Sequence, residues 1–186
     1  TIYGSFEETA QRFPERVAMI YLDEKIRYES LKDMVLRLSA SLLRLGIREG
    51  DRVVLYLFNM PQTIIAWLAL DRLGAIVVPV APVYSSQDLR YLVKDAGAET
   101  IFCMDSNFNY VNEILGKTPL QRVIVTNMLD LVSEFGLGLE DGAEGPDAAL
   151  ATTFFIQGSA RSLAEIARLA QVIELEDLPT DGREPS

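Results

Sequence analysis

Histidine is absent from the 186-residue chain, and Cys103 is its single cysteine. The first absence excludes a His-containing triad, a histidine general base and a histidine metal ligand. One cysteine cannot form an internal disulfide or a thiolate metal site, so a disulfide-built secreted scaffold is excluded and a cytoplasmic location is expected. Cys103 falls in a predicted buried strand, where we interpret it as a small core residue, because a reactive thiolate needs an electropositive, partly exposed setting.

The chain also has few basic residues. It contains 17 lysines and arginines and 27 aspartates and glutamates, which give a net charge of −10. A nucleic-acid-binding protein usually shows the opposite sign or a dense basic stripe, so this class is excluded. Long apolar runs are missing too, since the two longest, residues 63–70 and 74–83, are separated by Asp71 and Arg72. A spanning helix needs about 20 apolar residues, so we expect no transmembrane segment, and no signal peptide is visible.

The two common phosphate-binding glycine motifs, G-x-x-x-x-G-K-[ST] and G-x-G-x-x-G, are absent. The glycine cluster at residues 136–145 follows no convincing strand, so we interpret it as a plain loop. Two sets of carboxylates could be imagined as acid–base pairs: Asp23 with Glu24, and Glu174, Glu176 and Asp177. A turn and a solvated edge explain them better. Composition and spacing therefore identify no catalytic residue, no metal ligand and no cofactor-binding residue.

What is present is a composition of 49% hydrophobic and 24% charged residues, which is ordinary for a globular protein. The first part of the chain predicts a helix that begins at a capping box, residues 5–8, and ends at Pro14. Two strands, 17–21 and 26–28, follow around a turn, and Ser30 is predicted to cap a longer helix. The apolar stripe of that helix consists of Leu31, Val35, Leu38, Leu42 and Leu45.

From Asp51 onward, predicted strands alternate with predicted helices. Apolar runs predict four strands, the first two of them buried, at residues 53–58, 75–80, 100–104 and 122–126. Helical spacing predicts the intervening helices at residues 62–73, 86–96 and 109–115. Short strands separated by helices imply βαβ units, so the predicted fold class is α/β, with a largely parallel sheet, flanking helices and right-handed crossovers.

After Asn127 the pattern weakens, and the chain divides into four parts. We predict an α/β subdomain over residues 1–132, an acidic glycine-rich loop or insertion over 133–150, a strand–helix–strand segment over 151–176 and a linker over 177–186. The chain begins with Thr1 rather than methionine, so we expect it to be a piece of a longer protein.

The turn from Pro82 to Gln87 is the best local candidate for a ligand-facing loop. It follows a predicted strand directly and opens a predicted helix. Open α/β sheets bind ligands at the carboxyl ends of their strands, and a helix N-terminus favours anions. A plain strand-to-helix connection remains the alternative. The aromatic residues on apolar helix and strand faces are predicted to be core residues, namely Phe6, Phe13, Tyr28 and Trp67.

Six consecutive segments follow a familiar order. They are FEETAQRFPERVA at 6–18, IRYESL at 26–31, GIREGDRVV at 46–54, NMP at 59–61, LDRLGAIVVPVAP at 70–82 and SQDLRYLVKDAGA at 86–98. In this order and spacing the chain resembles the N-terminal portion of adenylate-forming enzymes, which include acyl-CoA synthetases, luciferase-like ligases and peptide-synthetase adenylation domains. The resemblance covers about residues 2–126, and the VPVAPVYS stretch at 78–85 is most similar to medium- and long-chain fatty-acid members.

The resemblance implies a two-step reaction in which a carboxylic acid attacks the α-phosphate of ATP, and the CoA thiol then displaces AMP to form a thioester. The implied cofactors are ATP, Mg²⁺ and CoA, and the implied partners are a carboxylic acid, the remainder of the ligase and, as an open alternative, a second copy in a homodimer. The family's phosphate loop, its adenine-binding motifs and its catalytic lysine do not occur before Ser186. No catalytic residue is therefore carried over to this chain, which we expect to be inactive alone.

Two other functions remain open from the sequence. A non-catalytic binding or interaction module could keep the ligase-like fold, and a flavodoxin-like small-ligand protein would share the parallel sheet by fold analogy.

Overall fold

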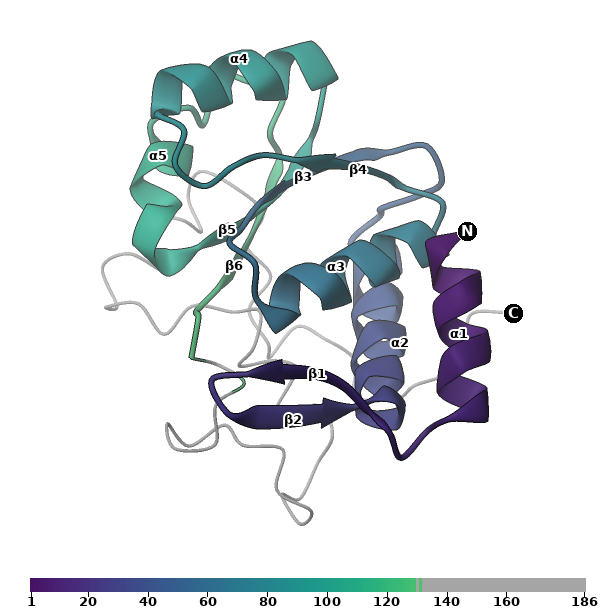
Figure 1. The fold of residues 1–186 in the computed structure, drawn as a ribbon. Helices are drawn as coiled ribbons and strands as arrows, with labels where there is room; N and C mark the ends of the chain where they lie inside the picture. Colours follow the sequence, from purple (N-terminus) through teal and green to yellow (C-terminus); the bar gives the residue numbers. More distant parts are fainter. Residues whose placement is uncertain (130, 132–186) are drawn as a thin grey trace.

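The computed structural model describes residues 1–129 and 131, so the predictions for residues 133–150, 151–176 and 177–186 lie outside the described residues. The described part has three layers (Figure 1). A parallel sheet forms the middle layer, helices α1, α2 and α3 with a β-hairpin lie on one side, and α4 and α5 lie on the other. The predicted α/β class with a parallel sheet is confirmed.

Helix α1 (Ile2–Arg12) begins earlier than the sequence predicts. The Thr1 hydroxyl accepts a hydrogen bond from the Gly4 amide, and the Asp71 carboxylate accepts one from the Tyr3 amide at 2.7 Å. The predicted capping box at residues 5–8 is therefore wrong, because Ser5 lies inside the helix. The carboxylate that satisfies the Tyr3 amide comes from 68 residues away, so no local pattern could have indicated it.

The hairpin pairs β1 (Val17–Tyr21) with β2 (Glu24–Arg27) in antiparallel register. Its turn has only two residues, Leu22 and Asp23, both with positive φ, so β2 starts two residues before the predicted strand and Tyr28 already belongs to α2 (Tyr28–Arg44). The predicted Ser30 cap is consequently wrong, since the N-cap position falls on Arg27. The predicted stripe of α2 is confirmed for its four buried members, Leu31, Val35, Leu38 and Leu42.

The four-stranded sheet contains β3 (Arg52–Tyr56), β4 (Ile76–Pro79), β5 (Thr100–Met104) and β6 (Arg122–Thr126). The strand order is β4-β3-β5-β6, and every neighbouring pair is parallel. The prediction that residues 75–80 form a buried strand is wrong in one respect. β4 lies at the edge of the sheet, so Ile76 and Pro79 are exposed.

Three helices connect these strands. They are α3 (Pro61–Arg72), α4 (Ser86–Ala96) and the short α5 (Phe108–Asn112), which follows the 3₁₀ turn η1 (Asp105–Asn107). The predictions for α3 and α4 are confirmed within one residue, whereas α5 ends three residues before the predicted position. Among residues 1–129 and 131, no helix is both long enough and apolar enough to cross a membrane.

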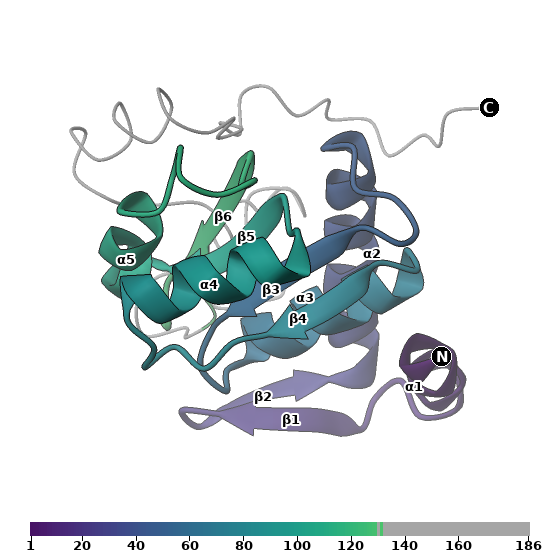
Figure 2. The ribbon, with the colours of Figure 1, turned by 90° about the horizontal axis from the view of Figure 1, so that it is seen from above.

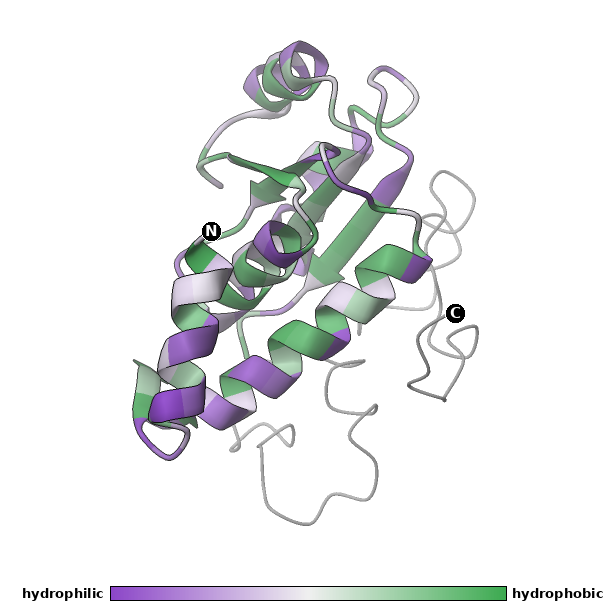
Figure 3. Cartoon of the chain, turned by 90° about the vertical axis from the view of Figure 1, so that its right-hand side faces the viewer, coloured by the Kyte–Doolittle hydropathy of each residue, from purple (hydrophilic) through white to green (hydrophobic). Residues whose placement is uncertain are grey.

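Alternate side chains of the strands form two cores. Val53, Leu55 and Phe102 face α1–α3 and the hairpin, whereas Val54 and Ile101 face α4 and α5. The hydropathy colouring in Figure 3 shows apolar residues along the strands and alternating apolar and polar residues along the helices. Figure 2, the view from above, shows α4 lying across the strands. Both faces of the sheet are covered, so its strand ends are what remains for a ligand.

Candidate functional site

The strand order creates a switch point between β3 and β5. The chain leaves β3 toward β4 on one side, and leaves β5 toward β6 on the other side. At the carboxyl ends of two such neighbouring strands the connections diverge, which is where open α/β sheets bind ligands. We name the segments that follow the four strands the carboxyl edge. They are residues 57–63 after β3, 80–88 after β4, 105–112 after β5 and 127–129 after β6.

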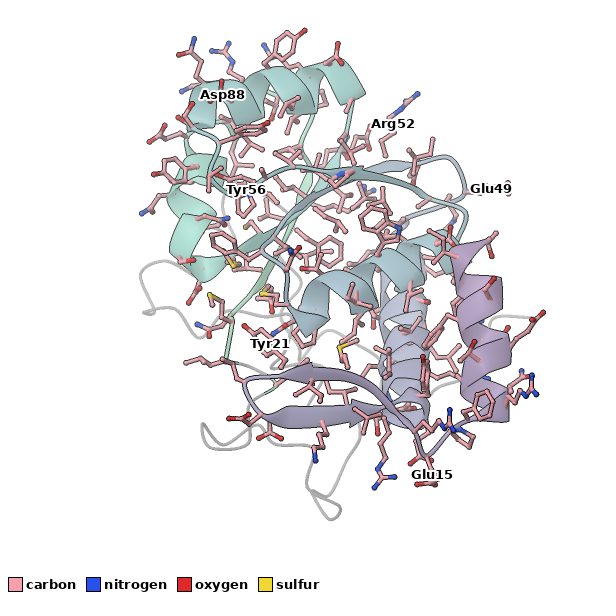
Figure 4. The ribbon with its side chains drawn as sticks, viewed as in Figure 1. Glu15, Tyr21, Glu49, Arg52, Tyr56 and Asp88 are labelled. Atoms are coloured by element: carbon pink, nitrogen blue, oxygen red, sulfur yellow. The ribbon has the colours of Figure 1, made fainter. Side chains whose placement is uncertain are left out.

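The structure places the predicted Pro82–Gln87 turn on this carboxyl edge, between β4 and α4. The hydroxyl of Tyr56, the last residue of β3, donates a hydrogen bond to the Tyr84 carbonyl at 2.6 Å. Burial raises the pKa of Tyr56, with smaller contributions from Tyr110 and Cys103, so this hydroxyl stays protonated and can donate. Figure 4 shows Tyr56 at the sheet end that lies below Asp88 of α4.

A second hydrogen-bonded residue at the switch point, Asn107, is not identified by the sequence analysis. Its amide nitrogen donates to the Tyr56 carbonyl at 3.1 Å, and its amide oxygen accepts from the Met104 backbone at 2.9 Å. Asn107 is buried, so these two bonds fix the turn after β5 against the end of β3. A short polar stretch directly after a buried strand, Asp105-Ser106-Asn107, is the signal that could have identified it.

The argument that the Pro82–Gln87 turn offers a helix N-terminus to an anion is wrong. Ser85 and Asp88 form a capping box in which the Asp88 carboxylate accepts bonds from the Ser85 hydroxyl at 2.6 Å and the Ser85 amide at 3.2 Å. A carboxylate of the chain itself therefore already occupies the positive end of α4. The turn stays a candidate contact for an uncharged group.

A chain of polar side chains joins the ends of β5 and β6 to α3. The Asn127 amide donates to the Asp105 carboxylate at 2.6 Å, and the Gln62 amide donates to the Asn127 carbonyl at 2.8 Å. Gln62 is fully buried, and its Oε1 atom has no hydrogen-bond partner among residues 1–129 and 131. On this side of the carboxyl edge, amide and carboxylate groups make these hydrogen bonds.

Exposed apolar side chains gather on the same edge. Phe58 after β3 is 43% exposed, Val83 and Tyr84 after β4 are 77% and 44% exposed, and Met128 after β6 is 41% exposed. None of the four edge segments contains a lysine or arginine, while Asp88 and Asp105 lie within them. The carboxyl edge of the described residues therefore offers apolar contact and no counter-charge for a phosphate.

Cys103 lies in β5 and is fully buried, as predicted. Burial raises the pKa of its thiol strongly, and the nearby Asp105 carboxylate raises it further, so the thiolate is disfavoured at neutral pH. We expect the native thiol to react with a disulfide reagent at least about 100-fold more slowly than the urea-unfolded chain at pH 8. A stopped-flow absorbance trace measures both rates, and equal rates would contradict the burial.

The remaining predicted residues have mixed outcomes. Phe6 and Trp67 pack against the core, and the ring of Tyr28 lies tilted against that of Phe6 with ring centroids 6.2 Å apart. The core prediction for Phe13 is wrong, because this half-buried ring lies between the guanidinium groups of Arg12 and Arg16, at 5.1 Å and 4.8 Å. Asp23 lies in the hairpin turn and Glu24 in β2, as expected of structural residues, whereas Glu174–Asp177 lies outside the described residues.

Comparison with known proteins finds one family model, described as AMP-binding enzyme, that matches residues 6–162. A long-chain-fatty-acid–CoA ligase of Escherichia coli is 31% identical over 134 residues, which are 72% of this chain and 24% of the ligase. A mouse mitochondrial medium-chain acyl-CoA ligase is 36% identical over 103 residues, 54% of this chain and 17% of that protein. The chain spans about a quarter of the length of the curated long-chain relatives that it matches.

The fold also has solved counterparts. The crystal structure of a long-chain-fatty-acid–CoA ligase from Archaeoglobus fulgidus superposes with a TM-score of 0.64 at 23% identity, over 67% of this chain and 27% of that one. At this identity the likeness shows a shared fold. The family model, by contrast, matches well over half of the chain.

Proposed function

The chain belongs to the AMP-binding enzyme family, and on this premise we propose that it is the N-terminal part of an ATP-dependent acid–CoA ligase that acts on fatty acids. The overall reaction joins a carboxylic acid to CoA while ATP is cleaved to AMP and pyrophosphate. Family membership supports the reaction class, and the fatty-acid ligases among the relatives support the class of acid.

The apolar carboxyl edge is the observation that carries the proposal for this chain. Phe58, Val83, Tyr84 and Met128 present apolar surface at the strand ends, where an acyl chain could be desolvated. The edge offers a triphosphate little charge compensation, because lysine and arginine side chains are the usual partners of its oxygens. The edge has no lysine or arginine, and Asp88 closes the N-terminus of α4, which leaves the uncapped N-terminus of α3 as the free amide group on this edge. We therefore assign the acyl group to this chain and the nucleotide to the part of the ligase beyond it.

Release of pyrophosphate tests the proposal. We expect the 186-residue chain to release none above the uncatalysed rate with ATP, Mg²⁺, CoA and a panel of C2–C18 acids. The longer gene product should release it with C8–C18 fatty acids, because those acids bury the most apolar surface per carboxylate. Turnover by the chain alone would contradict the assignment of the nucleotide site. The absence of turnover in both proteins would favour a non-catalytic binding module.

A further inference from the structure

Tyr56 connects two of the loops that border the switch point. Its hydroxyl donates to the Tyr84 carbonyl in the β4–α4 turn, and its backbone carbonyl accepts from Asn107 in the turn after β5. The two bonds join residues that are 28 and 51 positions apart in the sequence. The end of β3 therefore sets the position of the loops on both of its sides.

The hydroxyl and the ring of Tyr56 have different structural roles. The ring is fully buried in the core between the sheet and α4, where a phenylalanine would fill the same space. The hydroxyl instead satisfies a carbonyl in a turn whose side chains, Val83 and Tyr84, point largely into solvent and give the turn little packing of its own. At 2.6 Å the bond is short for a hydroxyl donor, and it ties the exposed turn to a rigid strand.

We infer that Tyr56 is a positioning residue for the acyl group, because its hydroxyl holds Val83 and Tyr84 in place on the carboxyl edge. The inference rests on the proposed function, in which this edge contacts the acyl chain. Holding a contact surface in its bound arrangement lowers the entropy lost on binding. Tyr56 does not itself touch the substrate, because its side chain is fully buried.

The substitution Tyr56→Phe removes the hydroxyl and keeps the ring. Hydrogen exchange of the Tyr84 amide, which donates to the Ala81 carbonyl within the same turn, reports whether the turn opens. We expect this amide to exchange about fivefold faster in the variant, as the loss of one hydrogen bond implies. The Met104 amide should keep its exchange rate, since its bond to Asn107 and the Tyr56 carbonyl are both unchanged. A general loss of stability would accelerate both amides.

Tyr21→Phe is the matched control. Tyr21 is a half-buried hairpin residue whose hydroxyl has no hydrogen-bond partner among residues 1–129 and 131, and Figure 4 shows it away from Tyr56. Dodecanoate is the probe, titrated into the 186-residue chain and followed through the amide chemical shifts of the carboxyl edge. We expect the Kd for dodecanoate to rise about fivefold in Tyr56→Phe and to stay unchanged in Tyr21→Phe.

The outcomes separate this inference from the proposed function. Unchanged Tyr84 exchange in Tyr56→Phe would overturn the inference, and so would faster exchange with an unchanged Kd for dodecanoate. If the unmodified chain does not bind dodecanoate at all, the acyl contact in the proposed function fails, and the inference fails with it for that separate reason.

Discussion

Replacing Ile65 with alanine is expected to lower the free energy of unfolding by about 2–5 kcal/mol. Ile65 is fully buried in α3, a helix with buried residues on most sides because α1, α2 and the sheet surround it. Truncation would leave a cavity that these neighbours cannot collapse to fill. A domain of this size is stable by only about 5–15 kcal/mol, so the loss is a large fraction of the total.

The neighbouring residue supplies the control for this experiment. Ile64 is 45% exposed, so Ile64→Ala removes the same atoms from the same helix and should cost less than about 1 kcal/mol. Urea unfolding followed by the fluorescence of Trp67, the single tryptophan, measures both variants at an unchanged m-value. Equal losses for Ile64→Ala and Ile65→Ala would show that the described packing of α3 is wrong.

The second large effect is expected at Asn107, where alanine should destabilise the chain by about 2–4 kcal/mol. The substitution removes the hydrogen bonds that Asn107 makes to the Met104 amide and the Tyr56 carbonyl, and both of these residues are fully buried. Each unsatisfied buried group costs about 1–3 kcal/mol. Thermal or urea unfolding checks the value. Asn109→Ala is the matched control, because Asn109 is exposed and its side chain makes no hydrogen bond within the described residues.

Asn107→Asp separates a hydrogen-bonding role from a packing role. One carboxylate oxygen can still accept from the Met104 amide, but the other faces the Tyr56 carbonyl and can donate only when protonated. The folded state would therefore raise the pKa of this aspartate above its unfolded value of about 3.9. The free energy of unfolding of the variant, relative to that of the unsubstituted chain, should be greatest below about pH 3.9. It should fall as the pH rises through the pKa of the aspartate in the folded state. If the difference in the free energy of unfolding between the variant and the unsubstituted chain did not change with pH, the two hydrogen bonds described for Asn107 would be contradicted.

Local patterns determined most of the elements. The helical spacing of Leu31, Val35, Leu38 and Leu42 predicted the buried face of α2, and the predicted bounds of α4 hold because Ser85 caps its start and Gly97 its end. The strand–helix alternation predicted the parallel sheet. These features depend on residues only a few positions apart. Side-chain periodicity and helix capping act over the same short separation, so the sequence alone predicts them.

The tertiary structure decided what lies at the strand ends. The order β4-β3-β5-β6 placed the switch point beside β3, exposed β4 at the edge and brought Tyr56, Tyr84 and Asn107 together. It also supplied Asp71 to the first turn of α1, which moved the start of that helix. Contacts between residues 28 to 68 positions apart depend on how whole layers pack. The sequence could therefore indicate that a ligand-facing edge exists, but not which side chains hold it in place.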